Sequence, residues 1–396
     1  MEQAHIDQIK TAFEKMQSKE DLLHVLNEAK PMIYGDKAVP FELKQLTWYA
    51  NPKLGQKRYV EFKIKKKSGA ERTINAPSNG LKSLQKTLSF VLQCVYEPHI
   101  AAMGFVRNRS IVDNANLHVG SIYVYNIDLK DFFPSIDQAR VWKCLQLKPF
   151  LLANSKQNLA NLIASLCCTE MEVERKNEIG EWQKVKRNAL PQGAPTSPVI
   201  TNIVCQKLDF LLTGVAKRFN LKYSRYADDI TFSSMHNVYQ PESEFLKELH
   251  RIVAEQNFHI KESKTRLQKE GYRKEVTGLL VNEKANVQQR YIKQLRMWLY
   301  YWERYGYDRA CGFFLQRYIA DKGHLKNGKP NMDNVISGKL EYLKMVKGAD
   351  NELYFKLKSR FNSIIGIEDP IKQVLNVWET DGIEQAMNFY YKDKLE

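Results

Sequence analysis

Hydrophobic and polar residues follow two different periods along this chain. Apolar residues at helical spacing, such as Ile6, Ile9 and Phe13 near the start, predict helices. Helices are expected over residues 1–50, 79–96, 138–170, 200–219 and 245–257, and over most of the chain from residue 288. β-Branched and aromatic runs predict strands over residues 58–64, 121–129, 222–226, 230–233 and 276–282. Strands that meet through hairpins, among irregularly spaced helices, indicate the α+β class rather than a doubly wound sheet.

Composition narrows the class of protein. The chain has 396 residues, of which 43% are hydrophobic, so we expect several folded regions rather than disorder. Its six cysteines form no CxxC pair, which argues against a zinc site and a disulfide framework and favours a reducing, cytoplasmic location. We expect no membrane span, because no uninterrupted apolar run of about 18 residues occurs. The charged N-terminus is unlike a signal peptide.

The net charge of +15 is unevenly distributed. Residues 52–90 contain ten Lys and Arg against two acids, and residues 286–362 contain fifteen basic against seven acidic residues. The tail after residue 362 reverses this balance, with seven acids against three bases. A basic surplus of this size favours a polyanionic partner, although solvated faces would look similar. The acidic tail could dock a partner protein or pack on the protein's own basic surface.

Three carboxylates are the strongest candidates for chemistry. Asp228 and Asp229 lie between two short strands, and Asp128 ends the strongest strand of the chain. Two adjacent carboxylates repel each other, and hard divalent cations such as Mg²⁺ relieve that repulsion. If the strand ending at Asp128 lies beside the hairpin, three carboxylates converge, as a two-metal phosphoryl-transfer site requires. An isolated Asp-Asp pair is also compatible with a solvated turn.

The surrounding motifs resemble the palm of reverse transcriptases. They are NIDLKDFFPSI at residues 126–136, LPQGAPTSP at 190–198 and YADD at 226–229, and they occur in the family's order. The resemblance implies a right-hand polymerase with fingers, palm and helical thumb. The implied boundaries are an N-terminal helical extension at 1–55, fingers at 56–120 with 138–189 as a fingers–palm connection, palm at 121–137 and 190–285, and a thumb with the acidic tail at 286–396.

The resemblance also implies roles for individual residues. Asp128, Asp228 and Asp229 would be catalytic and, with Leu129, would bind two Mg²⁺ ions. Lys264 would protonate the leaving pyrophosphate, although an exposed lysine without this role is an alternative. Phe133 would exclude a 2′-hydroxyl and so select deoxynucleoside triphosphates, whereas Phe132 is better suited to the core. The full set of implied nucleotide-binding residues is Lys66, Arg72, Asp131, Phe132, Phe133, Gln192, Gly193 and Lys264, with Lys65 and Lys67 competing for the role of Lys66.

Two further motifs resemble those of bacterial retron reverse transcriptases. One is the N-A-x-x-H element from Asn114 to His118, and the other is Val276-Thr277-Gly278. The resemblance implies RNA contacts by Asn114, His118 and Thr277, although a hydrogen-bonded structural histidine is an equal alternative for His118. It further implies a cognate retron noncoding RNA, priming from the 2′-hydroxyl of an internal guanosine, a branched RNA-linked DNA product (msDNA) and antiphage defence beside a separately encoded effector protein.

A basic helical face supports RNA binding independently of these motifs. Its residues recur at intervals of three and four: Arg290, Lys293, Arg296, Tyr300 and Arg304. Ile292, Leu295, Leu299 and Trp302 form the opposite, apolar face. Cationic and aromatic side chains together suit phosphate contacts and base stacking, although a solvated amphipathic helix is an alternative. Rival interpretations of the whole chain are a group II intron-like or abortive-infection reverse transcriptase, and a non-catalytic RNA-binding scaffold.

Overall fold

The computed structural model describes residues 3–51, 58–65, 69, 71–177, 179–322, 328–366 and 377–392. The chain divides into two compact units, Met1–Thr277 and Gly278–Glu396, and each is described by itself. Unit 1 combines helices with small antiparallel sheets, and the described part of unit 2 is mainly helical. The expected α+β class is confirmed. The division lies N-terminal of the palm–thumb boundary expected at 285–286.

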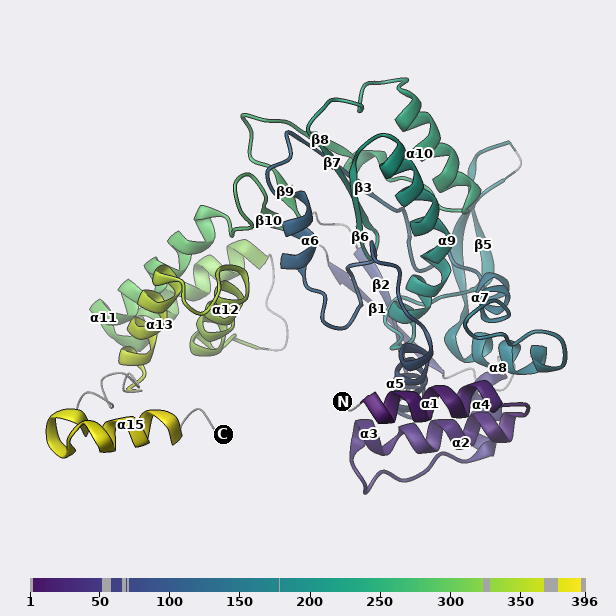
Figure 1. Ribbon diagram of the computed structural model, residues 1–396, viewed down its shortest axis with the longest axis horizontal. Helices are drawn as coiled ribbons and strands as arrows, with labels where there is room; N and C mark the ends of the chain where they lie inside the picture. The colour runs from purple at the N-terminus through teal and green to yellow at the C-terminus, as the bar shows by residue number, and fades with distance from the viewer. Residues whose placement is uncertain are drawn as a thin grey trace. The chain divides into compact units, whose positions relative to one another are not determined.

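The N-terminal helical segment of unit 1 consists of four helices rather than one. They are α1 (Gln3–Lys15), α2 (Lys19–Ala29), α3 (Pro31–Tyr34) and α4 (Leu43–Ala50). Ser18 starts α2 with a reciprocal capping box to Asp21, and Pro31 occupies the first turn of α3, which is where a helix tolerates proline. Helices α1 and α2 pack against α5 (Asn79–Val95), as Figure 1 shows.

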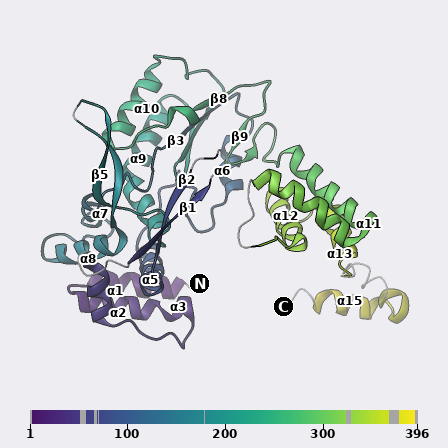
Figure 2. The ribbon, with the colours of Figure 1, turned by 180° about the vertical axis from the view of Figure 1, so that it is seen from behind.

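A four-stranded antiparallel sheet organises the rest of unit 1. Its strand order is β6-β7-β3-β8, formed by Lys222–Tyr226 (β6), Asp229–Ser234 (β7), Tyr123–Asp128 (β3) and Arg266–Gln268 (β8). The expected strands around residues 128 and 229 are therefore confirmed, and β3 lies directly beside β7. Helices α9 (Ser197–Arg218) and α10 (Glu244–Glu255) lie on the same side of this sheet in both views (Figures 1 and 2).

Two further hairpins extend from unit 1. Strands β1 (Tyr59–Lys65) and β2 (Glu71–Pro77) form the expected basic hairpin. Strands β4 (Thr169–Lys176) and β5 (Trp182–Ala189) form a second one, which follows helices α7 (Gln138–Leu145) and α8 (Gln157–Cys167) and the short turn η1 (Asn154–Lys156). The helical region expected over 138–170 is confirmed for α7 and α8, but it is interrupted between them, and β4 already begins at Thr169. Exposed Glu–Lys pairs such as Glu172–Lys184, 3.0 Å apart, stabilise the second hairpin and conceal its apolar alternation.

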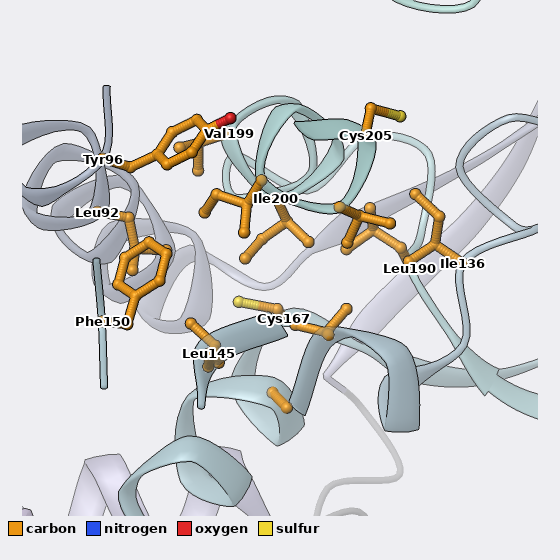
Figure 3. Close-up of a cluster of buried hydrophobic side chains, with 14 of the residues drawn as sticks. Leu92, Tyr96, Ile136, Leu145, Phe150, Cys167, Leu190, Val199, Ile200 and Cys205 are labelled. Carbon is orange, nitrogen blue, oxygen red and sulfur yellow. The ribbon is translucent and has the colours of Figure 1, made fainter. Parts of the chain in front are cut away.

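The core of unit 1 is centred on α9. Figure 3 shows Val199, Ile200 and Cys205 of this helix packed against side chains from α5, α7 and α8 and their flanking segments. Among the described helices, α9 is long and apolar enough to cross a membrane, but 67% of its apolar window is buried. Burial of this extent is what a central core helix requires.

The strand expected over residues 276–282 is interrupted close to the start of unit 2. The single strand expected over 276–282 is wrong, because only β9 (Glu275–Val276) and β10 (Leu279–Leu280) are extended. Thr277 and Gly278 between them have positive φ values of 47° and 85°. Further along, α11 (Gln289–Lys322) turns sharply at Gly306, whose φ is 77° and ψ 171°.

The two halves of α11 fold back on each other as a helical hairpin. The Gln294 side chain donates to Asp321 Oδ2 at 2.6 Å, and the rings of Tyr301 and Phe313 stack with centroids 4.2 Å apart. Only a residue without a side chain adopts the Gly306 conformation at low cost. Helices α12 (Met332–Lys347), α13 (Glu352–Ile364) and α15 (Ile383–Lys392) follow.

Candidate active site

Sheet register places three carboxylates at the same end of two neighbouring strands. Asp128 is the last residue of β3, and it pairs directly with Asp229, the first residue of β7. Tyr226 pairs with Asp229 across the β6–β7 turn, so Ala227 and Asp228 form the turn itself. The Leu129 amide donates to the Asp228 carbonyl at 3.0 Å, which fixes the turn against β3. The convergence expected for Asp128, Asp228 and Asp229 is confirmed.

The surroundings of these carboxylates disfavour negative charge. Burial raises the pKa of Asp229 to about 6, and the neighbouring carboxylates of Asp228 and Asp128 add to the shift. Burial, followed by repulsion from Asp128, also raises the pKa of Asp228. A bound cation would relieve both effects, because it replaces lost solvation and cancels the repulsion.

A lysine occupies part of this negative environment. Lys264, which ends the short turn η2 (Glu262–Lys264), places its ammonium against Asp128 Oδ2. About half of its side chain is exposed, whereas that of Asp128 is 8% exposed. Within the described residues, no three metal-ligating side chains are grouped tightly enough to enclose an ion by themselves. Leu129 can offer only its backbone carbonyl, because its side chain is apolar and 1% exposed.

The β1–β2 hairpin and the loop at residues 190–198 meet beside the carboxylates. The charge of Arg72 on β2 opposes the rise in the Asp228 pKa, so the guanidinium acts on the same site. The Asn75 amide donates to the Gln192 carbonyl at 2.8 Å. A side chain at Gly193 would lie 2.9 Å from the Asn75 carbonyl oxygen, so glycine permits this close approach. Lys66 lies outside the described residues.

The three residues expected to contact the nucleotide near Asp128 have different environments. Phe133 is half-buried, and its ring centroid lies 6.2 Å from that of Phe105, which is 42% exposed. Phe132 is 3% exposed and packs against Phe258, so its side chain is not available to a nucleotide in this conformation. Asp131 is exposed with a φ of 46° and lines a cavity of about 490 Å³ together with Lys130.

The two retron-like motifs meet inside unit 1. The Asn114 amide, on helix α6 (Ile111–His118), donates to Thr277 Oγ1 at 3.4 Å. His118 is 0% exposed, and its ring nitrogens lie 2.8 Å from the hydroxyls of Ser233 and Ser224. Asn114 is 1% exposed. The direct RNA contacts expected for Asn114 and His118 are therefore corrected, because both side chains are enclosed by protein; Thr277 is half-buried.

The basic face expected in the C-terminal region is present on the first half of α11. Arg290, Lys293, Arg296, Tyr300 and Arg304 are all exposed, whereas Leu295, Leu299 and Trp302 are buried. The predicted division of this helix into a polar and an apolar side is confirmed. Its contact with RNA stays a prediction.

A buried network lies behind the turn that carries Asp228 and Asp229, and the sequence did not predict it. Arg225 and Asp209, both 0% exposed, form an ion pair inside unit 1. The signal that could have revealed it is Asp209 itself, an acid in the middle of the apolar helix α9. Arg266 on β8 was also missed, although its charge opposes the raised pKa of Asp229.

Comparison with known proteins identifies the class that these features define. Residues 64–293 match the family described as Reverse transcriptase (RNA-dependent DNA polymerase). The chain belongs to the reverse transcriptase family, and its fold is the α+β right-hand polymerase fold. A solved telomerase structure from Candida albicans aligns with a TM-score of 0.41 and 12% identity over 85% of this chain and 67% of that chain, a likeness too weak to support an argument.

Curated relatives place the chain in the retron branch of this family. It is 37% identical over 281 residues to the Retron Mx162 reverse transcriptase of Myxococcus xanthus, covering 66% of this chain and 56% of that protein. It is 35% identical over 249 residues to the Retron Mx65 enzyme of the same organism, covering 63% and 57%. It is 32% identical over 247 residues to the Retron Ec86 reverse transcriptase of Escherichia coli, covering 60% and 68%. The aligned region thus spans between 56% and 68% of these relatives.

Proposed function

We propose that this protein is an RNA-directed DNA polymerase that uses two Mg²⁺ ions. The observation that carries the proposal is the convergence of Asp128, Asp228 and Asp229 at one end of the sheet. Burial and mutual repulsion raise the pKa of Asp228 and Asp229, so the site favours a cation. Family membership supports the same reaction.

The residues around the site suit nucleotidyl transfer. Asp128, Asp228, Asp229 and the Leu129 carbonyl would hold the ions, which when bound lower the pKa of an attacking hydroxyl and neutralise the leaving pyrophosphate. Lys264, whose ammonium contacts Asp128, would give a proton to the leaving group. Arg72 offers a bidentate fork to the triphosphate, and Lys66 a second positive charge.

Other residues would recognise the nucleotide sugar. The Asn75–Gln192 hydrogen bond of 2.8 Å holds Gln192 and Gly193 against β2, so the backbone position of both residues is fixed. Phe133, half-buried beside Phe105, would collide with a 2′-hydroxyl and favour deoxynucleotides. Asp131 lies two residues before Phe133 and is exposed, and we assign it a weaker role near the sugar and triphosphate.

The retron branch supports a more specific activity. We propose that the enzyme binds its cognate structured noncoding RNA, primes from the 2′-hydroxyl of an internal guanosine and leaves msDNA, in the cytoplasm and as part of antiphage defence with a separately encoded effector protein. The exposed basic face of α11 would hold phosphates of that RNA. Thr277, half-buried beside Asn114, would act by shaping the RNA-binding region.

The test compares the nucleic acid that copurifies with the wild-type protein and with its variants, all produced in cells that carry the native locus. Wild-type protein should copurify with DNA covalently joined to RNA, and Asp228→Ala/Asp229→Ala should copurify with RNA alone, because loss of two ligands removes the metal site. The matched control, Asp36→Ala/Asp350→Ala, alters two exposed aspartates outside the site and should retain the branched product. Plain RNA from the wild type would exclude retron activity, and DNA synthesis by the double variant would exclude the metal assignment.

A further inference from the structure

The buried ion pair behind the turn that carries Asp228 and Asp229 is fixed by two parallel hydrogen bonds. Arg225 Nε donates to Asp209 Oδ1 at 2.7 Å, and Arg225 Nη2 donates to Asp209 Oδ2 at 2.6 Å. Both side chains are 0% exposed. Buried ion pairs add little net stability compared with apolar residues of similar size, because desolvation offsets their attraction. Stability alone is therefore a weak explanation for this pair.

The remaining guanidinium donors point to the segment that presents the carboxylates. Arg225 Nη1 donates to the Ala227 carbonyl at 3.2 Å, one residue before Asp228. Arg225 Nη2 also donates to the Asn202 side chain at 3.1 Å. Since Asp209 fixes the plane of the guanidinium, the position of the Ala227 carbonyl is fixed through it.

The turn that Arg225 contacts has an unfavourable backbone conformation. Ala227 has a φ of 58°, and the left-handed region is costly for a residue with a side chain. On the opposite side, a side chain at Gly104 would lie 2.6 Å from the Ala227 nitrogen. The segment before Gly104 is bonded to the backbone of Arg225, which donates to Ala101 at 2.8 Å and accepts from Met103 at 2.7 Å.

We propose that Arg225 is a positioning residue for metal binding and DNA synthesis. It is buried and touches no substrate, but it holds the strained Ala227–Asp228 turn so that Asp228 and Asp229 face Asp128. Asp209 fixes Arg225, and Asn202 links it to Gly104 through a 3.0 Å hydrogen bond. This proposal rests on the proposed polymerase function and adds the element that shapes its metal site.

The decisive variant is Arg225→Met/Asp209→Leu, which replaces the ion pair with apolar groups of similar size. It should still fold, because apolar groups fill the volume of the ion pair, although Tyr223 and Asn202 each lose a hydrogen-bond partner. It also removes the Arg225 donor to the Ala227 carbonyl. We expect turnover to fall about 100-fold, as a displacement near 1 Å can cause. Mn²⁺ affinity, measured by electron paramagnetic resonance titration without substrate, should fall about tenfold, while KM for the nucleotide changes by less than about threefold because Arg72 and Gln192 are untouched.

Three single variants separate positioning from simple destabilisation. Arg225→Lys can keep a charge opposite Asp209 but lacks the fork that reaches Ala227, so it should not restore turnover or Mn²⁺ affinity. Tyr223→Phe removes the hydroxyl that donates to Asp209 at 2.7 Å and leaves all turn contacts intact. Leu26→Ala, in α2 and 0% exposed, destabilises unit 1 elsewhere. Both controls should keep the wild-type Mn²⁺ affinity.

The outcomes are distinguishable. A double variant with wild-type turnover and Mn²⁺ affinity would overturn the positioning role, as would full rescue by Arg225→Lys. If the wild type makes no DNA but the double variant still binds Mn²⁺ more weakly than the wild type, the polymerase proposal fails and the positioning role stands.

Discussion

The turn that carries Asp228 and Asp229 in unit 1 and the basic face of α11 in unit 2 have opposite charges and different degrees of burial. At the turn, Asp128 is buried, Asp228 is half-buried and Asp229 is exposed, and partial loss of solvation together with mutual repulsion raises the pKa of Asp228 and Asp229. On α11, the positive groups from Arg290 to Arg304 are exposed, and only the apolar side of the helix is buried. The clustered carboxylates suit a small cation that binds between them, whereas the exposed positive groups suit a large polyanion.

The difference also concerns what holds each surface. The carboxylates depend on strand register, a strained turn and the Arg225–Asp209 pair, so their geometry comes from long-range contacts. The α11 side chains depend only on helical spacing and on the burial of residues such as Leu295 and Leu299. Changes in the first region should therefore act through structure, and changes in the second through charge alone.

The largest expected effect is a loss of folding stability at low pH, caused by the buried imidazole of His118. Burial lowers the pKa of His118 to about 3, with a smaller contribution from Lys222. The unfolded chain binds this proton near pH 6.5, so stability is retained above pH 6.5 and lost as pH falls towards 3. The free energy involved is on the order of 4–5 kcal/mol.

Urea unfolding between pH 4 and 8 measures this loss. His118→Gln should flatten the decline below pH 6.5, so that the stability gap between wild type and variant narrows as pH falls. His250→Gln, at an exposed position of α10, should leave the wild-type profile unchanged. Parallel profiles for wild type and His118→Gln would contradict burial of a neutral imidazole and would reopen a surface role for His118.

The sequence predicted the carboxylates of the site better than it predicted the buried residues that pack around them. The three aspartates were predictable from the motifs around them, and the α11 face from helical spacing, because both signals lie in residues that are close together in the chain. The burial of His118 was not, because it depends on hydroxyls of Ser224 and Ser233, more than 100 residues away in the chain. The Arg225–Asp209 pair depends in the same way on the packing of α9 against β6.

Secondary structure failed where local signals conflicted. The β4–β5 hairpin was missed although Met171 and Val173 alternate with glutamates on β4, because most positions of β5 are polar or charged and exposed. The strand expected over 276–282 is broken by Thr277, a β-branched residue with a φ of 47°, which no propensity predicts. Both errors come from tertiary contacts that override local preference.

The second prediction concerns RNA binding by the exposed basic face of α11. Arg290→Ala/Lys293→Ala/Arg296→Ala/Arg304→Ala should weaken binding of the cognate RNA about 100- to 1,000-fold near 150 mM salt, and should reduce the salt slope by about 3 to 4. DNA synthesis at saturating concentrations of a short primer–template should remain, because the carboxylates are unchanged. Filter binding across a salt series gives both quantities.

A matched control removes the same charge from another surface. Lys10, Lys15, Lys19 and Lys44 are exposed on the N-terminal helices and their caps, and their combined change to Ala should alter RNA affinity much less. Equal losses in the two quadruple variants would show that net charge, rather than the α11 face, determines binding.

The smallest expected effect is the stabilisation of the folded protein by Mg²⁺ bound at the three carboxylates. In the folded protein the pKa of Asp229 is about 6, above its ordinary value of 3.8, so the charge of Asp229 costs stability fully above pH 6 and not below about pH 4. A divalent cation should relieve that cost only where the carboxylate is ionised. Mg²⁺ at ten times its dissociation constant should therefore add about 1.4 kcal/mol at pH 8, and much less at pH 5. Thermal unfolding of the wild type and Asp229→Asn measures this, and the variant should lose the pH 8 gain; an equal gain at both pH values would place the ion elsewhere.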